Sequence, residues 1–186
     1  MPQVCRSRGE GKESEGPFHA TWLECFAKRI AAYHEQIHKD ENKAVVSEYV
    51  MGVIDRSFEA MGSIFQDANV SPSLVHSDYN AWNMMIDPTT YELTGIIDPI
   101  DAGWSDYEID LFHLVNCRPD LKLLGRYLQG KKVDESFWLR YRFYRFWDDV
   151  KHYVRMGWYG EERFRRYAQE LETAMNEWLA QVGIFR

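Results

Sequence analysis

Two absences in this 186-residue sequence exclude whole classes of protein. No stretch approaches the roughly 18 consecutive apolar residues that a membrane-spanning helix needs. The start, MPQVCRSRGEGKESEGPF, also has no apolar run of the kind found in secretory signals. An excess of basic residues is missing too, because 29 acidic side chains outnumber 22 basic ones and the net charge is −7. This balance argues against nucleic acid and membrane surfaces as partners, and we expect a soluble cytoplasmic protein.

Cysteine is scarce, and its spacing forms no motif. The three cysteines, Cys5, Cys25 and Cys117, are far apart, and none belongs to a CxxC pair. The pattern predicts neither a disulfide framework nor a cysteine-based zinc site, and it fits a reducing compartment.

Residues 1–17 have few apolar side chains that could join a core, so we expect a flexible tail there. Their GEGKESEG stretch is not a phosphate loop, because Glu13 follows Gly11-Lys12 where Ser or Thr is required. The rest, residues 18–186, is expected to form one domain, since the chain is 45% hydrophobic and 15% aromatic.

The expected fold is mainly α with a small β-hairpin (α+β). Apolar residues recur at helical spacing over 20–39 and 46–65. Short strands are predicted at 74–75, 84–86 and 93–97, and the turn DPTTYE joins the last two into a hairpin buried in the middle of the domain. The helical remainder, 106–182, is expected to contain helices over 106–116, 119–129, 134–156 and 161–181.

The stretch LVHSDYNAWNMMID, residues 74–87, sets His76, Asp78 and Asn83 in an apolar context. Polar groups that must pack are costly unless they are bonded or used. Their spacing, His-x-Asp-x-x-x-x-Asn, is that of the catalytic loop of protein-kinase-like phosphotransferases. In this interpretation Asp78 accepts the proton of a substrate hydroxyl, and Asn83 offers its carbonyl oxygen to Mg²⁺. His76 would be structural, with its ring bonding backbone groups behind the loop.

A second metal ligand is expected from the hairpin 84–98. Asp98 ends an apolar strand fifteen residues after Asn83, and strand pairing would bring the two together so that one Mg²⁺ contacts both. This is the Asp-Phe-Gly position of protein kinases, but the triplet here is Asp98-Pro99-Ile100. The rigid proline leaves little scope for regulation by a flipping Phe.

Other interpretations of these residues remain open. A hydrolase triad lacks a Gly-x-Ser-x-Gly elbow, and a zinc site built on His76 and Asp78 lacks a further His at ligand spacing. The loop could also be satisfied by its own backbone. The Arg- and aromatic-rich stretch 138–166 fits a packed helix better than single-stranded nucleic acid. Near the site, Trp82, Asp101 and Trp104 are weak candidates for an acceptor pocket, with ordinary packing as the alternative for the tryptophans.

Three segments resemble one known family. PSLVHSDYNAWNMMI, GIIDP and WSDYEIDLFHL resemble the C-terminal lobe of fructosamine (ketosamine) kinases, within the wider aminoglycoside phosphotransferase and choline kinase-like group. ATWLECFAKRI resembles the helix that opens this lobe, and the resemblance covers about residues 20–180. It implies a kinase-like fold, ATP and Mg²⁺, and transfer of the γ-phosphoryl group to a hydroxyl of a small sugar or amino-sugar adduct.

The resemblance assigns roles to matching residues. Asp78 corresponds to the catalytic aspartate, and Asn83 and Asp98 correspond to the magnesium ligands. Asp110 corresponds to a buried aspartate that braces the catalytic loop by accepting its backbone N–H groups. Ser77 departs from the pattern, because the family usually has Gly there.

The N-terminal lobe of this group is not evident in the sequence. Nothing before Trp22 offers its Gly-rich cover or its phosphate-pairing Lys, so the chain looks like a C-terminal lobe alone. We then expect weak catalysis by the chain itself, and self-association through the surface left uncovered. The alternatives are an aminoglycoside- or choline-type kinase, and a non-catalytic remnant that binds a partner.

Overall fold

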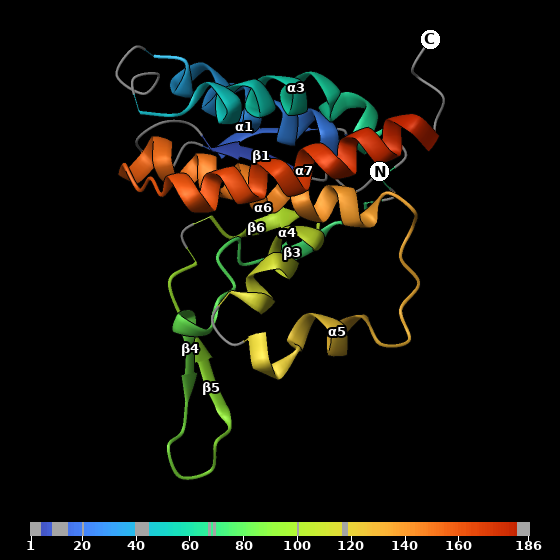
Figure 1. Ribbon diagram of the computed structural model, residues 1–186. Coiled ribbons are helices and arrows are strands. Elements are labelled where there is room, and N and C mark those ends of the chain that lie inside the picture. The colour runs from blue at the N-terminus through green and yellow to red at the C-terminus, as the bar shows by residue number, and fades with distance from the viewer. Residues whose placement is uncertain are drawn as a thin grey trace.

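Four long helices form the body of the protein. The computed structural model describes residues 5–8, 15–19, 21–39, 45–66, 68, 70–99, 101–116 and 119–181. The helices α1 (Trp22–Ile37), α3 (Glu48–Phe65), α6 (Phe137–Met156) and α7 (Glu161–Gln181) pack side by side (Figure 1). The mainly helical α+β fold predicted from the sequence is confirmed.

Each of these helices buries one apolar face, as the helical spacing predicts. Aromatic rings from three of them meet in the core, where Phe26 and Phe65 pack edge-on against Phe143 with ring centroids 6.0 and 5.3 Å away. Local signals set the ends: the Thr21 side chain caps α1 by accepting from the Glu24 N–H, and Gly157, with a φ of 70°, ends α6.

Two small antiparallel sheets lie beside this body. In one, β3 (Ser73–Val75) pairs with β6 (Gly103–Ser105); in the other, β4 (Met84–Ile86) pairs with β5 (Leu93–Ile96). The pairing of β4 with β5 matches the predicted hairpin, whereas no strand is predicted from the sequence at the position of β6. Short helical elements complete this half: η1 (Ala81–Asn83), α4 (Glu108–Leu111), η2 (Phe112–Val115), η3 (Pro119–Leu121) and α5 (Leu123–Leu128).

The hairpin is exposed, and its predicted burial is wrong. It projects away from the helical body (Figure 1), and Met85, Ile86 and Leu93 are each more than half exposed. The sequence predicts that this apolar hairpin lies buried in the middle of the domain. Composition alone does not show whether the surrounding chain covers such a hairpin.

Strands also occur where the sequence suggests a flexible tail. β1 (Cys5–Arg8) and β2 (Glu15–His19) form an antiparallel pair, and β1 contacts α1 and β6. Strand ladders are made by backbone groups, so a segment poor in apolar side chains can still form one. Cys25 is disulfide-bonded, contrary to the expectation from cysteine spacing, and its partner lies outside the described side chains.

A buried polar chain links this body to the segment that follows β6. The Trp22 Nε1–H donates to the Tyr144 hydroxyl (2.8 Å), which donates to Asp106 Oδ2 (2.7 Å). Asp106 in turn accepts the Glu108 N–H at the start of α4 (3.0 Å). The core thereby fixes where α4 begins. Among the described residues, no helix is both long and apolar enough to cross a membrane.

Candidate active site

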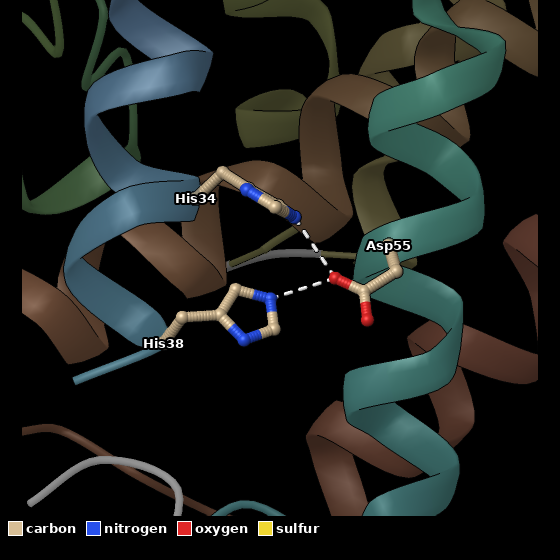
Figure 2. Close-up of side chains that lie close together, drawn as sticks. All are labelled: His34, His38 and Asp55. Atoms are coloured by element: carbon tan, nitrogen blue, oxygen red, sulfur yellow. Dashed lines mark hydrogen bonds and ion pairs between the residues drawn. The ribbon is translucent and has the colours of Figure 1, made fainter. Parts of the chain in front are cut away.

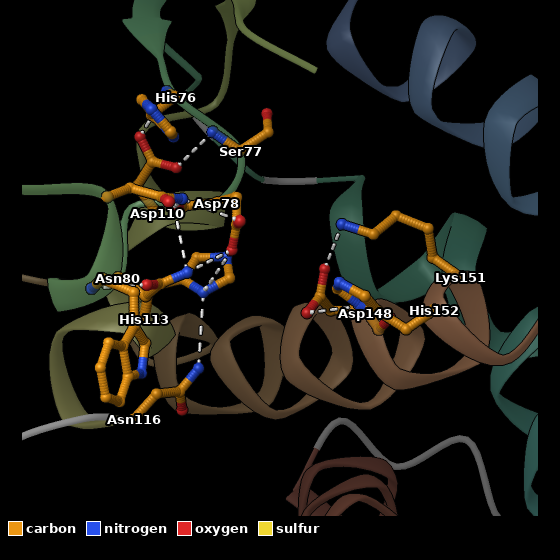
Figure 3. Close-up of polar contacts among 12 residues, drawn as sticks. His76, Ser77, Asp78, Asn80, Asp110, His113, Asn116, Asp148, Lys151 and His152 are labelled. Atoms are coloured by element: carbon orange, nitrogen blue, oxygen red, sulfur yellow. Dashed lines mark hydrogen bonds and ion pairs between the residues drawn. The ribbon is translucent and has the colours of Figure 1, made fainter. Parts of the chain in front are cut away.

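The loop after β3 is held from below by one carboxylate. Asp110 on α4 accepts the His76 N–H through Oδ2 (2.8 Å) and the Ser77 N–H through Oδ1 (2.7 Å; Figure 3). These are the backbone donors that the resemblance assigns to it. Asp110 is half-buried, where full burial was expected, because its side chain faces the loop, whereas Glu108 and Leu111 are the buried residues of α4.

The His76 ring ties the loop to the end of the hairpin. Its Nε2 lies 2.9 Å from the Ile97 carbonyl oxygen, and the Ile97 N–H donates to the Asn83 carbonyl oxygen at 2.9 Å. The ring thus bonds a backbone group, as the sequence interpretation expects. Both contacts bring the end of β5 against the loop that carries Asp78.

Two amides orient the Asp78 carboxylate. The buried Asn83 donates its Nδ2 to the Asp78 carbonyl oxygen and to Oδ2, both at 2.9 Å, and Asn80 donates its Nδ2 to Oδ1 at 2.7 Å. Asn80 was not predicted as a site residue. The Asn80 Oδ1 accepts the Trp82 N–H at 2.9 Å. Asn often forms such a turn with the backbone N–H two residues later, and this preference was the available sequence signal.

Asp98 lies at the end of the same hairpin. The pairing of Met84 with Ile96 and the Ile97–Asn83 backbone bond bring the chain next to Asn83 just before Asp98. Its carboxylate is exposed and makes no hydrogen bond or ion pair with a described residue. The Asn83 side-chain nitrogen donates to Asp78, so its Oδ1 remains available as a ligand. An amide oxygen and an unused carboxylate fit Mg²⁺, which prefers oxygen ligands.

His113 is a site residue that the sequence analysis missed. Its ring is buried, with Nδ1 3.9 Å from Asp78 Oδ1 and 3.4 Å from Asn116 Nδ2 (Figure 3). Burial lowers the pKa of His113 despite the opposing charges of Asp148 and Asp78, so the ring is neutral at pH 7. It therefore packs against Asp78 without cancelling its charge. The available signal was its position three residues after Asp110, on the same helical face.

A charged group on α6 stands across from the loop (Figure 3). Asp148 Oδ1 lies 2.5 Å from Lys151 Nζ, and Asp148 Oδ2 lies 3.3 Å from His152 Nδ1. Burial opposes ionisation of Asp148, but these two partners outweigh it and lower the pKa of its carboxyl. Both Asp148 oxygens thus pair with residues of its own helix, and we do not include Asp148 among the candidate metal ligands.

The three weak candidates for an acceptor pocket differ in their surroundings. Trp82, on η1, is 84% exposed, and Trp104, on β6, is 57% exposed. Neither therefore serves mainly to fill the core. Asp101 forms an ion pair with Arg155 at 2.7 Å; burial opposes its ionisation, but the charges of Arg155 and Lys151 lower the pKa of its carboxyl.

Ser77 has a strained backbone, which explains why glycine suits this position. Its φ is 65°, in the left-handed region, and its buried hydroxyl has no partner among the described residues. We expect Ser77→Gly to raise the free energy of unfolding by about 0.5–1 kcal/mol, because the strain and the unpaired hydroxyl are both removed.

Ser105 provides the matched control. It is also buried with an unpartnered hydroxyl, but it lies in strand β6. In an extended strand, glycine relieves no backbone strain. We therefore expect Ser105→Gly to lower the free energy of unfolding by about 0.5–1 kcal/mol. Urea unfolding of both variants measures this. A loss of stability in both would show that strain at position 77 is not the reason.

Comparisons with known proteins show similarity to a family of phosphotransferases. A family model described as "Phosphotransferase enzyme family" (APH) matches residues 11–147. The proteins named YcbJ from Escherichia coli strain K12 and from E. coli O157:H7 are each 29% identical over 112 residues, which covers 60% of this chain and 38% of YcbJ. The chain thus spans well under half the length of these relatives.

Two solved structures share the fold. Aminoglycoside 2′-phosphotransferase-IIIa, in a GDP complex, is 18% identical with a TM-score of 0.56, over 82% of this chain and 52% of that one. The aminoglycoside phosphotransferase APH(4)-Ia, as a thermostable mutant in its apo form, is 17% identical with a TM-score of 0.58, over 88% and 55%. With the family model matching more than half of the sequence, the chain belongs to the phosphotransferase enzyme family, APH.

Proposed function

We propose that this chain provides the catalytic loop and metal site of an ATP-dependent small-molecule kinase of the fructosamine kinase type. The reaction would move the γ-phosphoryl group of ATP to a hydroxyl of a small sugar or amino-sugar adduct. One observation carries the proposal: Asn83 holds Asp78 through its amide nitrogen, and its amide oxygen makes no hydrogen bond with a described residue. That division of one side chain is what a loop serving both substrate and Mg²⁺ requires.

In this proposal the residues act mainly by holding the reacting groups in place. Asp78 orients the acceptor hydroxyl and takes its proton, while Asn80 and Asn83 keep the carboxylate aimed. Asn83 and Asp98 would hold Mg²⁺, which would offset the negative charge of the nucleotide phosphates. Asp110 and His76 hold the loop against α4 and the hairpin.

A second candidate is an aminoglycoside kinase, which the shared fold of the two solved phosphotransferases favours. The two candidates differ in acceptor, a glycated amine against an aminoglycoside. A panel of both acceptor classes, assayed for phosphate transfer from ATP, separates them. A non-catalytic chain would use neither.

The metal site is tested by Asp98→Ala. We expect this variant to lose Mg²⁺-dependent nucleotide binding while the fold remains, because the exposed Asp98 carboxylate has no structural partner among the described residues. Calorimetry with and without Mg²⁺ measures the binding, and circular dichroism checks the fold.

The control for that experiment is Asp87→Asn, near the other end of the hairpin. Asp87 accepts the Thr89 and Thr90 N–H groups through Oδ1, a role that Asn can keep. Its nucleotide binding should equal that of the wild type. If Asp98→Ala binds Mg²⁺-nucleotide as well as both of these proteins, the assignment of Asp98 is wrong.

A further inference from the structure

A second group of potential metal ligands lies far from the catalytic loop in the sequence, between α1 and α3 (Figure 2). His34 Nε2 lies 2.8 Å from Asp55 Oδ1, and His38 Nε2 lies 2.7 Å from the same oxygen. The three ligand atoms lie within 4.8 Å of one another. Among the described residues this is the only group of three or more His, Cys, Asp or Glu side chains with that geometry.

The arrangement follows from helix geometry. His34 lies in the last turn of α1, and His38, four residues later, is the C-cap residue of that helix. The two side chains therefore project from one face, and Asp55 meets them from α3. The His34 ring stacks on Phe58 with centroids 4.2 Å apart and an interplanar angle of 13°. The His38 ring packs against His34 at 4.6 Å. The rings are thus oriented before any ion binds, which lowers the entropy cost of binding.

The ligand atoms of this group suit a borderline transition metal ion. Two imidazole nitrogens and one carboxylate oxygen, with two His at i and i+4, are a recurrent three-ligand set for Zn²⁺ that leaves a fourth position for water. With bonds of about 2.1 Å, tetrahedral ligands lie about 3.4 Å apart, so an ion needs only a small outward shift of the rings. All three side chains are partly exposed, which gives an ion access.

We propose that His34, His38 and Asp55 form a binding site for a Zn²⁺-type divalent cation that joins α1 to α3. The site differs in kind from the oxygen-only set at Asn83 and Asp98, which suits Mg²⁺, so the two sites select different ions. A bound ion would stabilise the contact between α1 and α3.

The test uses the tag-free 186-residue chain, with excess Mg²⁺ present throughout. Titration with zinc chloride in a calorimeter is expected to show one Zn²⁺ bound per chain and a higher thermal midpoint in its presence. Co²⁺, titrated in its place, is expected to give the visible absorption of a nitrogen- and oxygen-ligated ion without thiolate charge-transfer bands. This second readout does not depend on any variant.

Variants then locate the ion. His38→Ala and the isosteric Asp55→Asn should each weaken Zn²⁺ binding on the order of 100-fold or more, since changes even outside the ligand shell commonly cost 10–100-fold. His152→Ala is the control, because His152 also pairs with an aspartate, Asp148, but belongs to no group of three such ligands among the described residues. It should bind Zn²⁺ like the wild type. Absence of Zn²⁺ binding by the wild type, thiolate bands with Co²⁺, or unchanged binding in both ligand variants would each overturn the proposal.

Discussion

Arg140→Ala is expected to lower the free energy of unfolding by about 3–5 kcal/mol, the usual cost of leaving one member of a buried ion pair alone. The Arg140 guanidinium is 2% exposed and donates to both Glu108 oxygens, through Nε at 2.8 Å and Nη2 at 2.6 Å. It also pairs with the more exposed Asp134 at 2.9 Å. Glu108 and Asp110 share helix α4, so this pair also holds the residue that braces the catalytic loop.

The loss should depend on pH in a defined direction. Burial raises the pKa of Glu108 to about 7 in spite of the hydrogen bonds and charge of Arg140, which lower it. Without Arg140 the pKa rises further. Above about pH 7 the wild-type Glu108 is ionised and paired, whereas in the variant it must take up a proton or stay charged without a partner. The difference in stability therefore grows as the pH rises above 7.

Two further variants make this prediction specific. Arg165→Ala removes an exposed partner of Glu161, 4.0 Å away on α7, and should cost less than about 1 kcal/mol. The double variant Glu108→Gln/Arg140→Met removes both charges and should recover much of the stability lost in Arg140→Ala. Urea unfolding at pH 6 and pH 8.5 measures all of them. An Arg140→Ala loss no larger than that of Arg165→Ala would show that the pair does not anchor α4.

The long helices could be predicted because their information is local. Each buries one face along sixteen or more residues, and the 3.6-residue period in the sequence shows that face directly. The helix predicted over 161–181 has those limits in the structure. Short apolar runs beside turn residues also located β3, β4 and β5 to within about a residue, but β6 has no such signal. β6 has three residues, and its identity as a strand comes from its partner β3, about thirty residues earlier in the chain.

The residues of the candidate site also differ in how far their contacts reach along the sequence. Asp78 and Asn83 bond each other across five residues, so their spacing alone predicted that they act together. The pairing of β4 with β5 places Ile97, the residue before Asp98, against Asn83, as the predicted hairpin implies. Asp110 required the family resemblance, because its contact with Ser77 spans 33 residues. His113 and the Glu108–Arg140 pair were missed, since the packing of α4 and η2 against the loop and α6 decides their contacts, and no sequence period records it.

Asp78→Asn is expected to reduce phosphoryl transfer by about 10²–10⁴-fold, the usual contribution of a positioned general base. The change removes the charge that, in the proposed reaction, would take the hydroxyl proton. It also replaces the carboxylate by an amide at a place where two N–H donors, Asn80 Nδ2 and Asn83 Nδ2, point at the side chain of residue 78. An NH₂ group at position 78 would face one of them, so the side chain would turn and the acceptor hydroxyl would lose its alignment.

The assay for this variant requires a clamp on the nucleotide phosphates, which phosphoryl transfer needs in general. This chain spans about half of the two solved phosphotransferases, so the wild type and the variant are best compared when each is fused to the N-terminal lobe of a fructosamine kinase. Asp87→Asn, the same chemical change in the hairpin turn, serves as the control and should keep full turnover.

The partition between binding and turnover decides what Asp78 does. Asp78 is not one of the proposed Mg²⁺ ligands, so Asp78→Asn should bind Mg²⁺-nucleotide nearly as well as the wild type while turnover falls, whereas Asp98→Ala should lose the binding itself. Equal losses of nucleotide affinity in both variants would mean that Asp78 helps to hold the metal. Turnover within about tenfold of the wild type would mean that the transition state gains little from this carboxylate, and the catalytic role would then have to be reassigned.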